Sequence, residues 1–290
     1  MKLKKNKTPW PLRFVRWTFP KLEVVAPFLA HRYFIKIFFS PVRYPVPEKE
    51  KEIQKQSTRF TISVNNKKIE CYCWGSGPLI YVVHGWAGRA SQFIKIIQAL
   101  VDEGYKVVGF DGPAHGNSEG KSTDIIEFES VLKILHDQVG APEAIIAHSF
   151  GGGVVFYAAM NGLKVKCFIN IASPSIGDRI LEIYSRIIGG SAKTVAFFKN
   201  YIKQKTGKTF DEFTSGYFIK HIKQDFSLLL VYDEDDQEVD IENAYYLMKH
   251  YPSAVLYKTK GLGHVRILKD ESVINRCVTF IRESRLNSRN

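Results

Sequence analysis

The chain has 290 residues, of which 45% are hydrophobic and 24% charged, as in soluble globular proteins that bury a large core without disulfides or metals. Its net charge is +12, but residues 1–68 hold 16 Lys and Arg against 4 Glu, and the remainder is neutral. A neutral body is not a nucleic-acid-binding domain by overall charge, so we expect no nucleic-acid partner. The four cysteines form no CxxC pair, which predicts buried thiols in a reducing, cytoplasmic environment.

Residues 1–47 form a basic arm that is rich in aromatic side chains and contains seven prolines. The arm lacks the ~20 consecutive apolar residues of a transmembrane helix, and it lacks the apolar core and cleavage site of a signal peptide. Two interpretations remain open. The aromatic residues either pack on the main domain or on a partner subunit, which we prefer, or they dip into the headgroups of the inner membrane surface while Lys and Arg meet anionic lipid.

The next residues, 48–58, are charged at helical spacing and predict a solvated helix or linker. Alternating residues at 59–64 and 68–73 then predict a hairpin that turns at 65–67. Beyond the hairpin, short apolar runs alternate with helical stretches, which predicts a mostly parallel sheet covered on both faces. The predicted strands are 79–83, 106–110, 144–147, 165–171, 228–232 and 254–257, and the helices between them include 90–104, 123–139 and 241–251.

One interval, residues 176–226, is too long for an ordinary crossover and too aromatic for a disordered loop. We expect a small helical cap over the C-terminal edge of the sheet, where open α/β folds bind ligands. The expected organisation is an arm and linker (1–58), a first core part (59–175), the cap (176–226) and a second core part (227–290).

A serine stands on a predicted strand–turn–helix connection, in the stretch AHSFGG. Ser149 is either a buried turn residue or a nucleophile held on the turn. Small residues two positions before and after a nucleophile let such a turn close tightly, and here they are Ala147 and Gly151, with Gly152 giving further room. The backbone N–H of Phe150 would be one donor to an oxyanion.

The second oxyanion donor is expected from the loop after strand 79–83, which reads HGWAG. The N–H of Trp86 in this loop would point into the site. We expect His84 to brace the loop by hydrogen bonds rather than to titrate in catalysis. His148, beside the serine, is expected to be a bystander.

An acid and a base should follow later strands. The base would be His264, in the glycine-flanked stretch GLGH after the last strand. The acid would come from LLLVYDEDDQEVD, which lacks the glycine and ligand spacing of an EF-hand loop, so we expect no metal. Its candidate carboxylates are Asp233, Glu234, Asp235, Asp236, Glu238 and Asp240.

The order serine, acid, histidine differs from those of chymotrypsin-like and subtilisin-like enzymes. From about residue 59 to 284 the chain resembles the α/β-hydrolases, a family that includes esterases, lipases, thioesterases and peptidases. The resemblance rests on HGWAG, FDGPAHGNSEG, AHSFGG, DQEV and GLGH. The family's D-x-x-V pattern favours Asp236 over Asp235, and the family's loop after the fourth strand gives Asp111 and Ser118 a bracing role without catalysis.

The resemblance implies a serine hydrolase that cleaves a carboxylic ester or thioester through an acyl-enzyme. Ser149 would be the nucleophile, His264 the base and Asp236 its orienting acid, with the Trp86 and Phe150 amides as oxyanion hole and no cofactor. The aromatic cap favours a small, apolar acyl substrate. An acyltransferase or peptidase with the same triad, or a non-hydrolytic ligand-binding member of the fold, are the alternatives. The identity of the substrate and the oligomeric state stay open.

Overall fold

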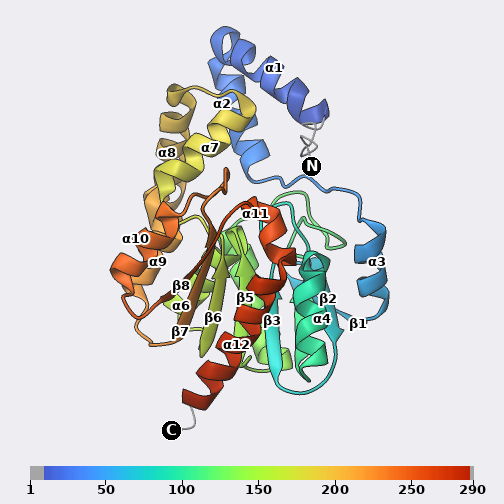
Figure 1. Ribbon diagram of the computed structural model, residues 1–290. Coiled ribbons are helices and arrows are strands. Elements are labelled where there is room, and N and C mark those ends of the chain that lie inside the picture. The colour runs from blue at the N-terminus through green and yellow to red at the C-terminus, as the bar shows by residue number, and fades with distance from the viewer. Residues whose placement is uncertain (1–9, 288–290) are drawn as a thin grey trace. The chain divides into compact units, whose positions relative to one another are not determined.

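The computed structural model describes residues 10–287, which fold into two compact units (Figure 1). The helical unit consists of residues 10–39 and Gly177–Glu212. The sheet unit consists of Ser40–Ile176 and residues 213–287. The chain therefore crosses from one unit to the other three times, and each unit is assembled from segments that are distant in sequence.

An eight-stranded sheet forms the centre of the sheet unit, in the order β1-β2-β4-β3-β5-β6-β7-β8. The pairs β1–β2 and β2–β4 are antiparallel and all the others are parallel. The predicted fold class, a mostly parallel sheet with an antiparallel N-terminal hairpin, is confirmed. The strands are β1 (Thr58–Val64), β2 (Lys67–Trp74), β3 (Leu79–Val83), β4 (Lys106–Phe110), β5 (Ala144–His148), β6 (Cys167–Ile171), β7 (Ser227–Asp233) and β8 (Val255–Thr259).

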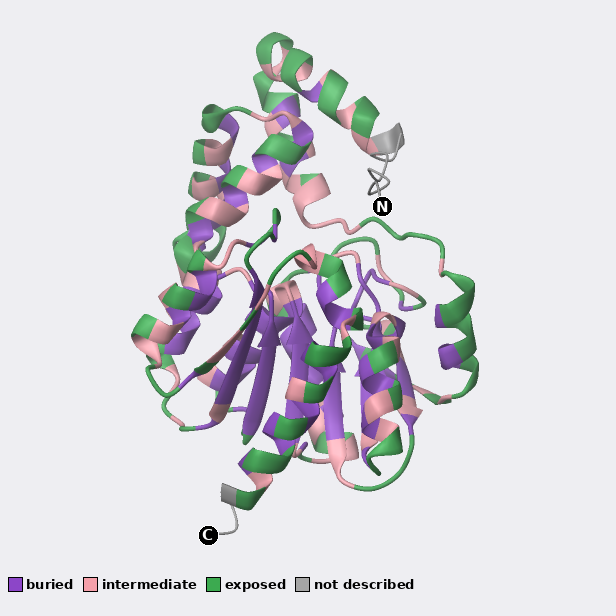
Figure 2. Ribbon diagram, viewed as in Figure 1, coloured by how far each residue is buried: buried purple, intermediate pink, exposed green. Residues whose placement is uncertain are grey.

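Helices cover both faces of this sheet, which explains why its central strands are buried along their whole length (Figure 2). One face packs against α5 (Ile125–Val139), α6 (Phe150–Met160), α9 (Ser215–His221) and α10 (Glu242–His250). The other face packs against α3 (Glu48–Lys55), η1 (Ala90–Phe93), α4 (Ile94–Asp102), η3 (Ile267–Lys269) and α12 (Glu271–Asn287).

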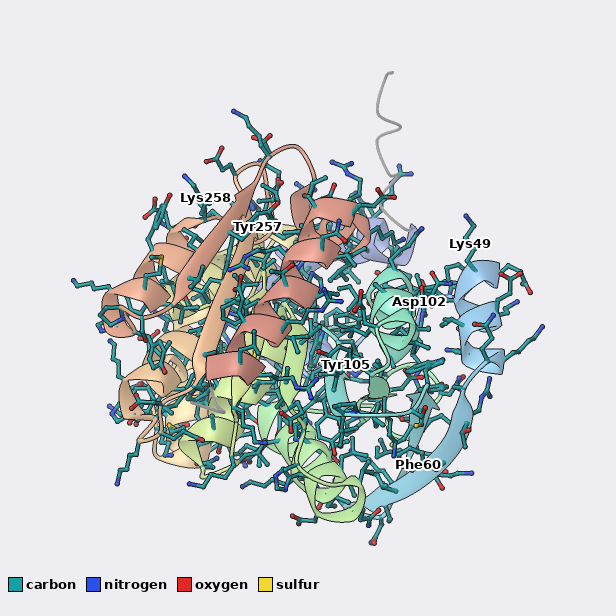
Figure 3. The ribbon with its side chains drawn as sticks, turned by 60° about the horizontal axis from the view of Figure 1, so that its bottom comes forward. Lys49, Phe60, Asp102, Tyr105, Tyr257 and Lys258 are labelled. Atoms are coloured by element: carbon teal, nitrogen blue, oxygen red, sulfur yellow. The ribbon has the colours of Figure 1, made fainter. Side chains whose placement is uncertain are left out.

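The hairpin that starts the sheet turns at Asn65 and Asn66, which have φ values of 47° and 60°. Two consecutive positive φ values are typical of a type I′ turn, and asparagine is among the few non-glycine residues that adopt them readily. The turn leaves β1 as an edge strand, and Phe60 lies on this edge (Figure 3).

Helix α3 is helical as predicted, but one of its faces is buried rather than solvated. Ile53 is packed in the core, and its carbonyl accepts a 2.7 Å hydrogen bond from the indole of Trp74. The buried carboxylate of Glu50 pairs with Arg89 at 2.6 Å. Lys49, on the same helix, is exposed and points away from the sheet (Figure 3). The partner of Glu50 lies 39 residues away, so the helical spacing alone could not reveal the buried face.

The helical unit is built from α1 (Trp10–Val25), α2 (Pro27–Phe38), α7 (Gly177–Ile188) and α8 (Ala192–Thr206), and it ends within η2 (Phe210–Phe213). Phe34 of α2 is fully buried, and its ring centroid lies 5.4 Å from that of Tyr184 and 5.2 Å from that of Phe198. The aromatic residues of the arm thus pack on the inserted segment, a partner that the sequence did not indicate. None of the helices within residues 10–287 has the length and apolar character required to cross a bilayer.

Candidate active site

Ser149 lies on a tight turn between β5 and α6, the connection that the sequence predicts. Its φ of 52° is rare for a residue other than glycine and stores strain in the backbone. The turn is tied at both ends: the Ser149 N–H donates to the carbonyl of Ile171, and the Ser149 carbonyl accepts from the N–H of Gly152, both at 2.9 Å. This geometry lifts the serine side chain out of the strand, as in a nucleophile elbow.

The small residues behind Ser149 are required by close backbone contacts. A Cβ on Gly151 would lie 2.4 Å from the carbonyl oxygen of Val83 and 2.6 Å from that of His84. A Cβ on Gly152 would lie 2.2 Å from Oδ1 of Asn170. The prediction that these two glycines make room for the turn is confirmed, since any side chain there would collide with its neighbours.

The loop after β3 lies directly against the serine. A Cβ on Gly85 would come within 2.9 Å of the Ser149 Cβ. His84 is fully buried and holds this loop, because its Nε2 accepts from the Gly112 N–H at 2.8 Å and its Nδ1–H donates to the Gly85 carbonyl at 2.7 Å. Burial holds the pKa of His84 well below its usual range, so the ring stays neutral and structural, as predicted.

Trp86, in the same loop, is placed by a second histidine. The N–H of the next residue, Ala87, donates to Nε2 of His115 at 3.0 Å, and burial lowers the pKa of His115 to about 4. The Trp86 ring meets the Phe150 ring edge to face at a centroid distance of 5.2 Å. Phe150 is the first residue of α6, where backbone N–H groups lack intrahelical partners. Both predicted oxyanion donors therefore belong to segments that flank Ser149.

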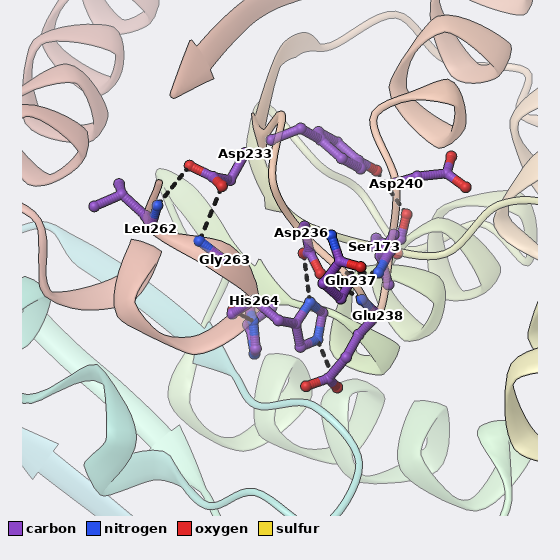
Figure 4. A network of polar contacts seen from close by, with 12 residues as sticks. Ser173, Asp233, Asp236, Gln237, Glu238, Asp240, Leu262, Gly263 and His264 are labelled. Carbon is purple, nitrogen blue, oxygen red and sulfur yellow. Dashed lines mark hydrogen bonds and ion pairs between the residues drawn. The ribbon is translucent and has the colours of Figure 1, made fainter. Parts of the chain in front are cut away.

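His264 lies on the short helix α11 (Gly263–Arg266), and its side chain reaches the acidic loop after β7. Its Nδ1–H donates to Oδ2 of Asp236 at 2.8 Å (Figure 4). Asp236 is buried, and its other oxygen accepts from the N–H groups of Glu238 and Val239. Asp235 is exposed, so of the two adjacent aspartates it is Asp236 that contacts the histidine.

The order of motifs, the fold and this geometry can be set beside known proteins. The chain matches the family model described as alpha/beta hydrolase fold over residues 78–184. YugF, an uncharacterized hydrolase of Bacillus subtilis, is 25% identical over 253 residues, which cover 71% of this chain and 90% of that protein. An esterase of Pyrococcus furiosus has the same fold, with a TM-score of 0.64 and 21% identity over 84% of this chain and 96% of the esterase.

The chain has the α/β-hydrolase fold. A shorter match points the same way: a monoacylglycerol lipase of Mycolicibacterium smegmatis is 30% identical over 86 residues, which cover 27% of this chain and 31% of the lipase. At the level of enzyme class, the chain is thus a hydrolase.

The imidazole of His264 stands between two carboxylates. Its Nε2 lies 3.9 Å from Oε2 of Glu238, whose side chain is 64% exposed (Figure 4). Burial by itself would lower the pKa of His264. The hydrogen bond and charge of Asp236, with the charge of Glu238, outweigh burial and raise the pKa above its usual value. Within residues 10–287, no hydrogen bond joins His264 to Ser149, a contact that often tightens only when substrate binds.

Asp233 holds the loop that carries His264. Its buried carboxylate accepts from the N–H of Leu262 at 3.0 Å and from the N–H of Gly263 at 2.9 Å (Figure 4). It also accepts from the hydroxyl of Thr259 at 2.8 Å. Although burial opposes it, this set of donors lowers the pKa of Asp233. The sequence placed Asp233 among six candidate acids, and its contacts make it a positioning residue for the histidine loop.

His148 was expected to be a bystander because His264 is the predicted base, and the structure adds a contact between the two residues. The Nε2–H of His148 donates to the backbone carbonyl of His264 at 2.8 Å, and the two rings lie 4.7 Å apart. Burial, followed by the charge of His264, lowers the pKa of His148 to about 3, so the ring keeps the neutral form that makes this bond. No local pattern could reveal this bond, because His148 and His264 are 116 residues apart.

Asp111 and Ser118 brace the loop after β4, as the resemblance implied. The two oxygens of Asp111 accept from the N–H groups of Ala90 and Asn117, and the Tyr72 hydroxyl donates to it at 3.0 Å. The Ser118 hydroxyl donates to the Asp111 carbonyl and accepts from the backbone N–H of Glu70. These bonds are internal to the scaffold and leave neither side chain available for chemistry.

Proposed function

We propose that this α/β-hydrolase is a serine hydrolase that cleaves carboxylic esters or thioesters through an acyl-enzyme. The observation that carries the proposal is the bond from Nδ1–H of His264 to Asp236. It fixes the tautomer in which Nε2 has a free lone pair, the form that can take a proton from a serine. Ser149 supplies that hydroxyl on a strained turn whose neighbour, His148, holds the backbone of the same histidine.

The reaction follows from these positions. Ser149 Oγ attacks the substrate carbonyl carbon as its proton passes to Nε2 of His264, and the charge of Asp236 stabilises the imidazolium. The N–H groups of Phe150 and Trp86 hold the negative oxygen of the tetrahedral intermediate. His264 then returns the proton to the departing alcohol or thiol, which leaves Ser149 acylated. Water, deprotonated by His264, attacks the acyl carbon; the bond to Ser149 Oγ then breaks, His264 returns the proton to Oγ, and the carboxylic acid is released.

An apolar acyl group suits the residues that surround Ser149. The half-buried rings of Trp86 and Phe150 contact each other beside the serine, and Phe128 packs against the Phe150 ring at a centroid distance of 5.2 Å. Aromatic walls with a few polar groups are typical of sites for apolar ligands. The names of the relatives, an esterase and a monoacylglycerol lipase, support an ester substrate.

A fluorophosphonate probe, which reacts with activated serines, tests the proposal. We expect the wild type to be labelled and Ser149→Ala to be unlabelled, while Ser130→Ala on α5 is labelled like the wild type. Failure of the folded wild type to react would refute the proposal. Turnover of p-nitrophenyl esters of increasing chain length, acyl-CoA thioesters and a peptide substrate then separates esterase from peptidase, and added alcohol acceptors reveal acyl transfer.

The choice of acid is tested with the same esters. Asp236→Asn should lower kcat by about 10⁴-fold, because the tautomer of His264 is then no longer enforced. Asp235→Asn, a change of the exposed neighbouring residue, is the matched control and should retain the wild-type kcat. Equal losses in both variants would contradict the role given to Asp236.

A further inference from the structure

Helix α1 carries apolar residues on two opposite faces. One face is used inside the helical unit: Phe19 is fully buried, with its ring centroid 6.4 Å from that of Tyr33 and 6.3 Å from that of Phe34. The other face contains Phe14, Trp17, Val24 and Val25, spaced by three, seven and one residues, which places them on one side of a helix. These four side chains are exposed in the structure.

Helix α2 extends this exposed surface. Its Ala30 and Phe34 are buried, whereas Phe28 and Leu29, just after the turn from α1, are exposed. We call Phe14, Trp17, Val24, Val25, Phe28 and Leu29 the apolar face; their exposed fractions run from 54% to 84%. Figure 2 shows most of α1 and the turn into α2 as exposed. Single exposed apolar residues are ordinary, but six large ones within sixteen consecutive residues mark an interaction surface.

Cations accompany the apolar face. The Lys21 ammonium lies 3.5 Å from the centroid of the Trp17 ring, and the Arg32 guanidinium lies 5.7 Å from that of Phe28. Arg13 and Arg16 are exposed on α1 as well. Aromatic rings paired with cations on an amphipathic helix are suited to the boundary between lipid headgroups and acyl chains.

Glu23 is the one acidic residue of the sequence up to position 39, and its carboxylate binds residues at the start of α8 rather than the cations beside the apolar face. Glu23 accepts hydrogen bonds from the backbone and hydroxyl of Ser191 and from the hydroxyl of Thr194, at the start of α8. Although burial opposes it, these bonds lower the pKa of Glu23. The carboxylate is thereby engaged inside the helical unit and does not neutralise the cations beside the apolar face.

Charge is concentrated in the same unit. In the sequence, residues 1–39 and 177–212 together contain 16 Lys and Arg against 5 Asp and Glu. The rest of the chain contains 25 Lys and Arg against 24 Asp and Glu. This excess opposes the pairing of the apolar face with a second copy of itself. A nucleic acid would satisfy the cations but would leave the valines and leucine in water. An anionic bilayer satisfies both features at once.

We propose that the apolar face of α1 and α2 is a peripheral docking surface for anionic lipid bilayers. The aromatic and aliphatic side chains enter the headgroup region, and Arg13, Arg16, Lys21 and Arg32 meet lipid phosphates. The docking holds the chain at the membrane surface with the helices lying in the interface, and it is independent of the chemistry at Ser149.

Vesicle binding by the full-length chain tests the proposal. Phosphatidylcholine vesicles that contain phosphatidylglycerol should bind the protein and shift its tryptophan fluorescence to the blue, more strongly at low salt than at high salt. Vesicles of phosphatidylcholine alone should bind much more weakly. Equal binding to both vesicles, or no binding to either, would overturn the proposal.

Two variants locate the surface without disturbing buried residues. Trp17→Gln with Phe28→Gln should weaken binding by about tenfold or more, since two rings no longer leave water. Arg13→Gln with Arg16→Gln should weaken binding by about fivefold for each cation lost and flatten its salt dependence. The matched control, Ile126→Gln with Val255→Gln, changes two exposed apolar residues of the sheet unit and should bind like the wild type.

Two further results would count against the docking surface. One is an equal loss of binding in the Ile126 and Val255 control. The other is a lipid-free oligomer, seen by light scattering, that Trp17→Gln with Phe28→Gln converts to monomer, because a second copy would then occupy the face. Circular dichroism of each variant confirms that the compared proteins are equally folded.

Discussion

The two ring nitrogens of His264 face different carboxylates with different exposure. Asp236, buried and hydrogen-bonded, sets the tautomer, whereas Glu238 is largely exposed and approaches the nitrogen that should receive the serine proton. His148 and Asp233 bind backbone groups around His264: the carbonyl of His264 itself and the N–H of Gly263. Contacts to the side chain and contacts to the main chain thus both position the proposed base. Different substitutions can remove each kind of contact.

Glu238→Gln should move the acid limb of the kcat/KM profile to lower pH. The charge of Glu238 helps to raise the pKa of His264, and only the neutral imidazole can act as base, so removing the charge lets it deprotonate at lower pH. Of the groups that face His264, Asp236 is unchanged and His148 stays neutral. Because Glu238 is exposed, the shift should shrink at high salt.

The measurement is kcat/KM for a soluble ester across the acid range. Glu234→Gln is the matched control, because Glu234 is an exposed carboxylate of the same loop whose partner is Lys258 at 3.5 Å. We expect its profile to match that of the wild type. If the acid limb of the kcat/KM profile of Glu238→Gln stays at the same pH or moves to higher pH, Glu238 does not act on His264.

Individual elements show how strongly the turn at Ser149 depends on its glycines. Three consecutive glycines follow Phe150, the first residue of α6, and a Cβ would meet very different surroundings at the first and the third of them. At Gly151 it would collide with two backbone carbonyls, which cannot yield without moving β3. At Gly153 the nearest atom, the Ser215 hydroxyl oxygen, would lie 3.4 Å away, an ordinary contact.

Gly151→Ala should therefore lower the free energy of unfolding by about 1–3 kcal/mol and slow fluorophosphonate labelling of Ser149. Gly153→Ala is the matched substitution two residues on, and it should leave labelling intact and stabilise the helix by up to about 1 kcal/mol, because alanine has the higher helix propensity. Urea unfolding and labelling rates measure both effects. Equal behaviour of the two variants would disprove the steric account.

On the scale of the whole molecule, the arm and the inserted segment depend on each other. Residues 10–39 belong to one compact unit with Gly177–Glu212, and Phe198 is fully buried beside Phe34, Phe38 and Phe39. Removing the arm would uncover this aromatic surface. For this reason point substitutions, rather than truncation, test lipid binding without altering the fold of the unit.

Deletion of residues 1–39 should increase hydrogen–deuterium exchange along α7 and α8, because these helices lose the aromatic residues that pack on them. Strands β3 and β5, in the core of the sheet unit, should remain protected and serve as the internal control. Unchanged exchange in α8 would contradict the packing of the arm as the source of its stability.

Much of the fold could be predicted because its signals are local. Strands β3 and β4 begin and end where the apolar runs begin and end, and the Asn-Asn turn and the AHSFGG connection follow from the preferences of a few neighbouring residues. The residues proposed for catalysis could be named because their motifs follow one another in the order of a known family. The buried face of α3 escaped prediction because Arg89, which makes it possible, belongs to another segment.

The sequence by itself determined the alternation of strands and helices, the place of Ser149 on its turn and the excess of positive charge near the N-terminus. Only the tertiary structure decided that Asp236 rather than Asp235 contacts His264, that His148 and Asp233 hold the histidine, and that the arm packs on the insertion. The physical reason is the distance along the chain between the residues that interact. Backbone preferences and hydrophobic periodicity act over a few residues, whereas hydrogen bonds, pKa shifts and aromatic packing depend on distances between segments far apart in the chain.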